Sequence, residues 1–285
     1  MQSILIKRQL RRLGGVTLLL LGIASAAAQP SAEPTAWQRA EQLDIKPLTL
    51  PRLQARGFEG VTVLYDGETE QWHSTSPTWF ERQAIPASTF KVMSSLAALE
   101  SGVVTSLDQR IALAQYTSSR EEINRELDFA SAFKLSALPH YQQLVRRIGS
   151  ARMQRYLDVV GYGNRDMGGG HDQFWIAGDL KISPRQQIEF LRRLVADDLP
   201  LRTVVMAQVR QIMRRDELGG RLRAKTGWAT SVEGLHTGWS IGWLEREDAE
   251  PLFFATLLQT DALGDSFLDI RLGLSLDAVT QYNQR

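Results

Sequence analysis

The pattern of apolar and polar positions predicts β-strands at both ends of the chain and helices between them. Residues 61–65 are rich in β-branched side chains, and Asp66-Gly67 separates them from a second short segment at 70–73, which is the pattern of a β-hairpin. Short runs of β-forming residues predict three more strands in the C-terminal part, at 222–227, 238–244 and 251–258.

Helical periodicity dominates the stretch between these strands. Apolar residues at helical spacing predict a helix over 88–100. We expect Ser150 to cap a helix that ends near Gly161. The sequence Ser-Pro-Arg-Gln at 183–186 predicts a capping box with proline at the first helical position. An amphipathic helix over 267–282 closes the chain.

This order of elements predicts an α+β fold. We expect an antiparallel sheet formed from N- and C-terminal strands, flanked by helices, with an all-helical subdomain inserted at about 103–215. The mature chain, 29–285, is expected to form one catalytic domain. Within it, 29–55 is expected to provide a short arm and an entry helix.

The first 28 residues have the three-part pattern of a secretory signal peptide. Four basic residues at 7–12 precede an apolar run at 16–24 that is too short to span a bilayer, and small residues follow up to Ala28. We therefore expect cleavage near Ala28, secretion to the periplasm, and no membrane anchoring of the mature chain. An uncleaved N-terminal anchor is the alternative interpretation.

Composition narrows the classes of function. Lys+Arg total 33 and Asp+Glu total 32, so the net charge of +1 gives no reason to expect a nucleic-acid partner. The absence of cysteine excludes disulfides, thiolate zinc sites and a cysteine nucleophile. Four histidines lack metal-ligand spacing, so we expect no metal: His73, His140, His171 and His236.

The first candidate for catalysis is Ser88-Thr89-Phe90-Lys91. Serine and lysine at positions i and i+3 of a helix lie on one face, about 5–6 Å apart at Cβ. A serine hydroxyl needs a base before it attacks a carbonyl, and a buried lysine with a lowered pKa can serve. The helix N-terminus would stabilise a developing oxyanion. Taken alone, the motif also fits a capped helix with a solvated lysine.

The second candidate is Lys225-Thr226-Gly227, at the end of a predicted strand. Alternation places Lys225 and Arg223 on one face of that strand. The lysine would face a cleft, Thr226 would donate a hydrogen bond, and Gly227 would leave room for a ligand. The alternative interpretation is an exposed strand end.

Two further triplets complete the set. Ser136 in Ser136-Ala137-Leu138 would relay a proton or cap a helix. Residues 162–164, Tyr-Gly-Asn, follow a predicted helix C-terminus, where Gly and Asn are expected for structural reasons.

The order of these four motifs is that of the penicillin-recognising serine enzymes. The chain resembles class D (OXA-type) serine β-lactamases in particular, from about Gly60 to the C-terminal helix, and this implies the β-lactamase/transpeptidase-like fold. The resemblance rests on Pro-Ala-Ser-Thr-Phe-Lys at 86–91, Tyr-Gly-Asn at 162–164, Phe-Trp-Ile-Ala-Gly at 174–178 with Leu-Lys-Ile-Ser at 180–183, and Ala-Lys-Thr-Gly-Trp at 224–228. Class A enzymes need a Glu-x-x-Leu-Asn pattern that is absent here.

The resemblance implies a two-step hydrolysis of a small-molecule β-lactam through a Ser88 acyl-enzyme. It implies no separate cofactor, but N-carboxylation of Lys91 by CO2, so that the carbamate is the general base and Trp175 hydrogen-bonds it. The implied roles of the remaining residues are proton transfer by Ser136, an oxyanion hole from the backbone N–H groups of Ser88 and Trp228, and substrate binding by Lys225, Thr226, Gly227 and Arg271.

Two positions depart from the family pattern. Leu138 replaces a common valine, and Ser240 replaces a large aromatic residue. These departures concern rate and substrate range. A penicillin sensor that acylates without turnover and a DD-peptidase remain alternative functions. The chain is expected to be a monomer or a homodimer.

Overall fold

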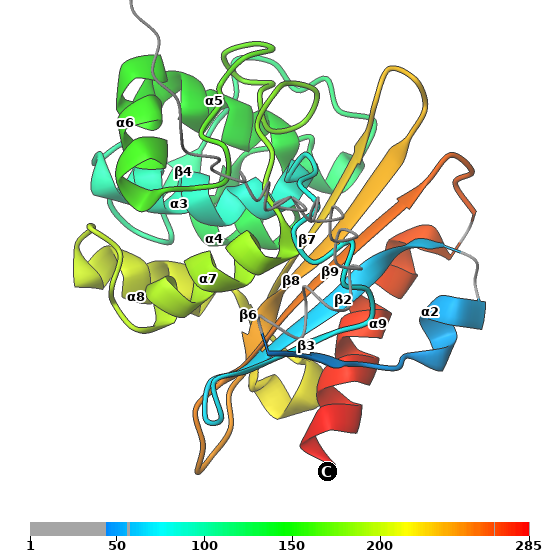
Figure 1. Ribbon diagram of the computed structural model, residues 1–285. Helices are drawn as coiled ribbons and strands as arrows, with labels where there is room; N and C mark the ends of the chain where they lie inside the picture. The colour runs from blue at the N-terminus through cyan, green and yellow to red at the C-terminus, as the bar shows by residue number, and fades with distance from the viewer. Residues whose placement is uncertain (1–43, 56–57, 265, 285) are drawn as a thin grey trace, which may run out of the picture. The chain divides into compact units, whose positions relative to one another are not determined.

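A seven-stranded sheet in the order β1-β3-β2-β9-β8-β7-β6 carries the part of the chain that the structure describes (Figure 1). The structure is a computed structural model that describes residues 44–55, 58–264 and 266–284. The strands of this sheet are β1 (Ile45–Pro47), β2 (Glu59–Asp66), β3 (Gln71–Ser74), β6 (Arg214–Arg215), β7 (Leu222–Thr230), β8 (His236–Leu244) and β9 (Leu252–Thr260). Two short strands, β4 (Arg110–Ile111) and β5 (Leu127–Asp128), form a separate pair.

Helices cover both faces of the large sheet. Helix α9 (Phe267–Asn283) packs on one face, and α7 (Pro184–Val195) packs on the other (Figure 1). The remaining α-helices are α2 (Pro51–Ala55), α3 (Phe90–Glu100), α4 (Phe129–Lys134), α5 (Leu138–Ile148), α6 (Ser150–Val160) and α8 (Thr203–Ile212), with 3-10 turns η1 (Ala87–Thr89), η2 (Glu121–Ile123) and η3 (Glu217–Gly220). Within the described ranges, no helix has the length and apolar character needed to span a membrane.

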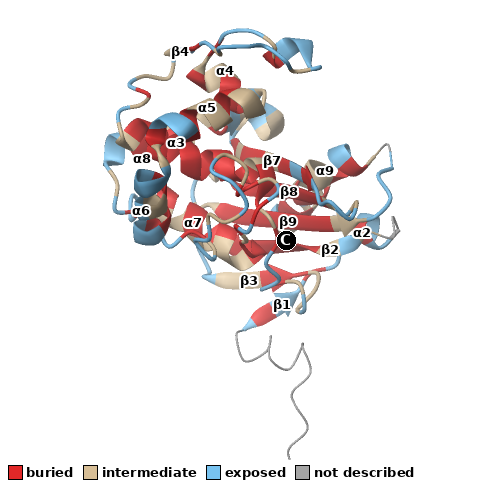
Figure 2. Ribbon diagram, turned by 90° about the horizontal axis from the view of Figure 1, so that it is seen from above, coloured by how far each residue is buried: buried red, intermediate tan, exposed pale blue. Residues whose placement is uncertain are grey.

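The central strands are buried on both faces, as Figure 2 shows by their red colour. In β9, Phe254 and Leu258 pack with α9, whereas Ala255 and Leu257 pack in the larger core with α3, α5 and α7. This explains why β9 is a near-continuous apolar run in the sequence rather than an alternating one.

The predicted α+β fold is confirmed, with corrections. The insertion at about 103–215 is not all-helical, because it contains the paired strands β4 and β5. The hairpin, the three C-terminal strands and the closing helix form within a few residues of their predicted bounds. The sheet is not wholly antiparallel, because β1 pairs in parallel with β3. Ser150 is not the predicted cap: Gly149 occupies that position, and the Ser150 hydroxyl bonds Nδ1 of His171 instead. The signal peptide and the arm before Asp44 lie outside the described residues.

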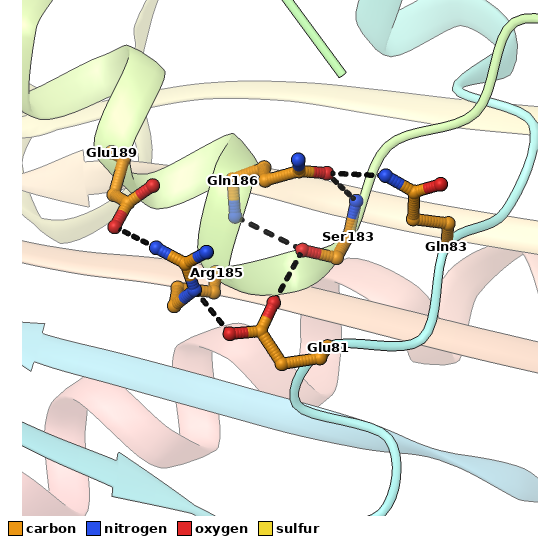
Figure 3. Close-up of polar contacts among 6 residues, drawn as sticks. All are labelled: Glu81, Gln83, Ser183, Arg185, Gln186 and Glu189. Atoms are coloured by element: carbon orange, nitrogen blue, oxygen red, sulfur yellow. Dashed lines mark hydrogen bonds and ion pairs between the residues drawn. The ribbon is translucent and has the colours of Figure 1, made fainter. Parts of the chain in front are cut away.

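The predicted capping box at the start of α7 is confirmed (Figure 3). Ser183 Oγ accepts a hydrogen bond from the Gln186 backbone N–H at 3.2 Å, and Gln186 Oε1 accepts one from the Ser183 N–H at 3.0 Å. Arg185, at the second helical position, bonds both Glu81 and Glu189. The first turn of α7 is therefore tied to the segment around Glu81.

That segment leads to the candidate nucleophile. Gln83 Nε2 donates to Gln186 Oε1 at 3.0 Å (Figure 3), and Ala84 forms two backbone hydrogen bonds with Ile182, at 2.9 and 3.0 Å. The chain entering η1, which carries Ser88, is thereby held against the start of α7.

Ser240 lies in a row of buried hydroxyl groups on the α9 side of the sheet. Thr256 Oγ1 is 2.9 Å from both Thr62 Oγ1 and Ser275 Oγ. Ser240 is opposite Thr256 in the ladder, but its fully buried hydroxyl has no hydrogen-bond partner among the described residues. At this departure from the family pattern, one hydroxyl of the buried row therefore has no partner among the described residues.

We predict that Ser240→Ala raises the free energy of unfolding by about 1 kcal/mol, because it removes a buried hydroxyl without breaking a hydrogen bond. Chemical denaturation measures the change. Ser275→Ala is the matched control, and it should lower stability because it deprives Thr256 of a partner. A loss of stability in Ser240→Ala would show that its hydroxyl is satisfied.

Candidate active site

Ser88 and Lys91 are in direct contact at the junction of η1 and α3. Lys91 Nζ donates to Ser88 Oγ at 2.9 Å, and the lysine side chain is fully buried. Burial, and to a smaller extent the positive charge of Arg120, lower the pKa of Lys91 to about 7. A substantial fraction of the amine is therefore neutral near pH 7, as a base acting on Ser88 requires.

Trp175 lies beside this pair. Its ring stacks on that of Phe90 with centroids 5.3 Å apart, and its carbonyl accepts the Ala87 N–H at 2.9 Å. The indole nitrogen is buried and has no hydrogen-bond partner among the described residues. The structure thus brings the predicted Trp175 to the catalytic turn and leaves one donor available there.

Two residues near Lys91 were not predicted from the sequence, Tyr141 and Arg120. The ring of Tyr141 lies 5.2 Å from Lys91 Nζ, and its hydroxyl is 2.8 Å from Ser95 Oγ. Arg120 Nη2 donates to the carbonyl of Leu135, next to Ser136, at 3.1 Å. The one sequence signal for this part of the pocket is Ser95, which lies one helical turn after Lys91 and therefore on the same face of α3.

Lys225 and Ser136 meet although 89 residues separate them. Lys225 Nζ donates to Ser136 Oγ at 3.0 Å and to the Thr226 carbonyl at 2.8 Å. Burial, and then the nearby charge of Lys91, hold the pKa of Lys225 well below its usual value. Ser136 has a φ of 55°, so it occupies a left-handed conformation uncommon for serine rather than a helix cap.

Gly227 allows β7 to approach the nucleophile. A Cβ atom at this position would lie 3.0 Å from the Pro86 carbonyl oxygen and 3.2 Å from the Ser88 nitrogen. Any side chain here would push the strand away from η1.

Among the described residues, no strand pairs with the outer edge of β7 beyond Arg223, because β6 pairs only with Leu222 and Arg223. The Ala224 N–H bonds the Met213 carbonyl, so residue 224 faces this outer edge. Alternation along the strand then turns the backbone N–H of Trp228 to the same edge. The oxyanion hole of Ser88 and Trp228 stays a prediction.

Arg271 reaches the same strand from α9. Its Nη1 donates to the Gly227 carbonyl at 2.6 Å, and its Nε donates to the Leu268 carbonyl at 2.7 Å. Burial lowers the pKa of Arg271 to about 10, so the side chain remains cationic near neutral pH. Arg271 and Thr226 therefore flank one end of the candidate site.

The Tyr-Gly-Asn triplet is structural in the described geometry. Asn164 donates to the Asp179 carbonyl at 2.8 Å and accepts the Lys181 N–H at 2.9 Å. Gly163 has a φ of 54°, and a Cβ there would lie 2.1 Å from the Lys181 carbonyl oxygen. The triplet thus closes the loop that carries Trp175.

No group of three or more potential metal ligands occurs in the part of the chain that the structure describes.

Leu138 begins α5 and is partly buried against the larger core, two residues after Ser136.

Comparisons with known proteins agree with this geometry. The family described as penicillin binding protein transpeptidase domain matches residues 23–269. β-Lactamase OXA-48 of Klebsiella pneumoniae is 36% identical over 210 residues, 72% of this chain and 78% of that protein. The solved class D β-lactamase YbXI from Nostoc is 32% identical, with a TM-score of 0.76, and the match covers 81% of this chain and 96% of the other.

The chain belongs to the class D serine β-lactamases. The family resemblance seen in the motifs is confirmed, and this class D β-lactamase is a hydrolase. The regulatory protein BlaR1 of Bacillus licheniformis is also 35% identical over 192 residues, 66% of this chain but only 32% of BlaR1. The roles assigned to individual site residues stay predictions.

We predict that Lys91→Met stabilises this β-lactamase by about 2 kcal/mol in CO2-free buffer at pH 7, because the buried amine is replaced by an apolar side chain of similar length. Thermal and chemical unfolding measure the change. Lys134→Met, at an exposed lysine, is the control and should change stability by less than about 0.5 kcal/mol. Unchanged or lower stability in Lys91→Met would mean that burial of this amine does not lower the free energy of unfolding.

Proposed function

We propose that this enzyme hydrolyses penicillin-like β-lactams through an acyl-enzyme on Ser88, with Lys91 carboxylated by CO2 as the general base. The observation that carries the proposal is the buried Lys91 of lowered pKa, bonded to Ser88 beside an indole N–H of Trp175 that has no partner among the described residues. After export to the periplasm, this activity would give resistance to β-lactam antibiotics.

In the first step, Ser88 Oγ bonds to the lactam carbonyl carbon and the ring C–N bond breaks. The Ser88 proton leaves toward the base at Lys91, and the ring nitrogen gains a proton through Ser136, whose hydroxyl is bonded to Lys225. The backbone N–H groups of Ser88 and Trp228 stabilise the oxyanion. In the second step, water attacks the ester, releases the ring-opened acid and restores the Ser88 hydroxyl.

The substrate carboxylate would bind at the end of the site that contains Arg271, Lys225 and Thr226. Arg271 donates to the Gly227 carbonyl and Lys225 to the Thr226 carbonyl, so both side chains lie at this segment of β7. Charge-assisted hydrogen bonds from such groups contribute more than neutral ones do. This end of the site therefore selects anionic β-lactams.

The surroundings of Lys91 fit an N-carboxylated side chain. CO2 reacts only with a neutral amine, and the lowered pKa makes that form available near pH 7. The buried N–H of Trp175 would donate to the carboxylated group, which would supply a general base at Lys91. Tyr141 and Phe90 exclude water from this pocket.

Two alternatives share these motifs. The first is a penicillin sensor, which would form the Ser88 acyl-enzyme and not turn over. The likeness to the regulatory protein BlaR1 is the observation behind this alternative. The transpeptidase family match raises a DD-peptidase acting on acyl-D-Ala-D-Ala. Steady-state turnover of a penicillin separates hydrolysis from sensing, and release of D-Ala from such a peptide tests the third possibility.

We expect Ser88→Ala to abolish both the covalent penicillin adduct and turnover, because no other hydroxyl is bonded to Lys91 among the described residues. Intact mass after incubation with a penicillin reports the adduct. Ser94→Ala, in α3, is the matched control and should still acylate. An adduct that persists on Ser88→Ala would refute the assignment, and an adduct on the wild type that never clears would favour the sensor.

We expect turnover to fall as the pH drops through about 7, because protonated Lys91 neither accepts a proton from Ser88 nor reacts with CO2. Added bicarbonate should restore part of the activity in degassed buffer near pH 7. Trp175→Phe should need more bicarbonate for the same rate. Carbon-13 NMR in labelled bicarbonate provides an independent readout, and the lack of both a carbamate resonance and bicarbonate stimulation would leave Lys91 acting as a plain amine.

A further inference from the structure

Trp228 is a large apolar side chain that is exposed yet held in place. Its side chain is 41% exposed, and its indole Nε1–H donates to Nδ1 of His236 at 3.4 Å. The two rings are inclined by 28° with centroids 6.0 Å apart. A side chain fixed before a ligand arrives loses little conformational entropy on binding, so an exposed and fixed indole is suited to recognition.

His236 is itself held from two sides. The Thr230 hydroxyl lies 2.8 Å from His236 Nδ1, and the ring of Phe267 on α9 lies 6.4 Å away, centroid to centroid. An indole N–H only donates, so Nδ1 of His236 is the acceptor and carries no proton. The pair thus depends on one specific tautomer of His236, with the proton on Nε2.

The indole lies at the end of the site that binds the carboxylate. Side chains alternate along a strand, so Trp228 and Thr226 share a face of β7, about 7 Å apart. Arg271 reaches the Gly227 carbonyl on the same side, one helical turn after Phe267, which contacts His236. Trp228 therefore stands beside the groups proposed to hold the substrate carboxylate.

Exposed apolar side chains occur in the two segments next to Trp228. Val232 and Leu235 in the turn between β7 and β8 are exposed, and so are Leu263 and Leu268 after β9. The two segments adjoin, because His236 pairs with Thr260 at the end of β9. Exposed apolar side chains that gather beside a site indicate contact with apolar groups of a ligand.

We propose that Trp228, positioned by His236, selects the ring substituent next to the substrate carboxylate and favours a neutral aromatic group there. The proposal rests on the proposed function and deepens it by naming a substrate class: cephalosporins with an aromatic group at C3, the ring position adjoining the carboxylate. An aromatic group stacks on the indole, whereas the charge of Arg271 opposes a cationic substituent.

Two cephalosporins that share one acyl side chain test the proposal, one with a neutral aromatic ring at C3 and one with a methyl group. The measured quantity is the ratio of their kcat/KM values, aromatic over methyl, in which effects common to both substrates cancel. Trp228→Ala and His236→Ala should each lower this ratio about fivefold, mainly through KM for the aromatic substrate. His236→Asn keeps an acceptor near the position of Nδ1 and should recover most of the wild-type ratio. Val204→Ala, at an exposed valine on α8 outside the site, is the control and should leave the ratio unchanged.

The outcomes distinguish the two proposals. If the wild type neither hydrolyses nor is acylated by either cephalosporin or a penicillin, the proposed function fails. If it hydrolyses both cephalosporins and the ratio is the same in wild type, Trp228→Ala and His236→Ala, only the role of the Trp228–His236 pair is wrong. A ratio lowered equally by His236→Asn and His236→Ala would show that the ring of His236, and not its acceptor, positions Trp228.

Discussion

The burial of the Lys91 amine is the constraint on which the rest of the structure depends. Moving the pKa of Lys91 from 10.5 to about 7 corresponds to a loss of folding free energy on the order of 5 kcal/mol, present in full below pH 7 and absent above pH 10.5. The cores on both faces of the sheet must offset this. In return, the chain holds a proton acceptor against Ser88 where water would otherwise keep the amine charged.

The sheet and the helices contribute different parts of the site, and backbone contacts join them. The strand β7 brings Lys225 and Gly227, whereas η1 and α3 bring Ser88 and Lys91. The absence of a side chain at Gly227 lets these two elements touch. The bridge between Ala84 and Ile182 then holds the nucleophile turn from its other side. Main-chain contacts therefore set the relative positions of the elements, and the catalytic side chains extend from these fixed positions.

Much of the fold and part of the site could be predicted from the sequence, for physical reasons. A helix cap such as Ser183 involves only residues a few positions away in the sequence, and the contact between Ser88 and Lys91 is local in the same sense. The roles of Ser136 and Lys225 came from the family resemblance, but the hydrogen bond between the two side chains was not predicted. Tyr141 could not be predicted, because its place against Lys91 depends on how α3 and α5 pack. Short-range rules also failed at Ser150, where a tertiary hydrogen bond competes with the cap.

The open edge of β7 has a consequence for the kind of molecule that the enzyme accepts. An unpaired strand offers alternating N–H and C=O groups at the spacing of a peptide backbone. A ligand whose amide and carbonyl follow that spacing would add to the sheet as an eighth strand beside Trp228, whatever its ring system.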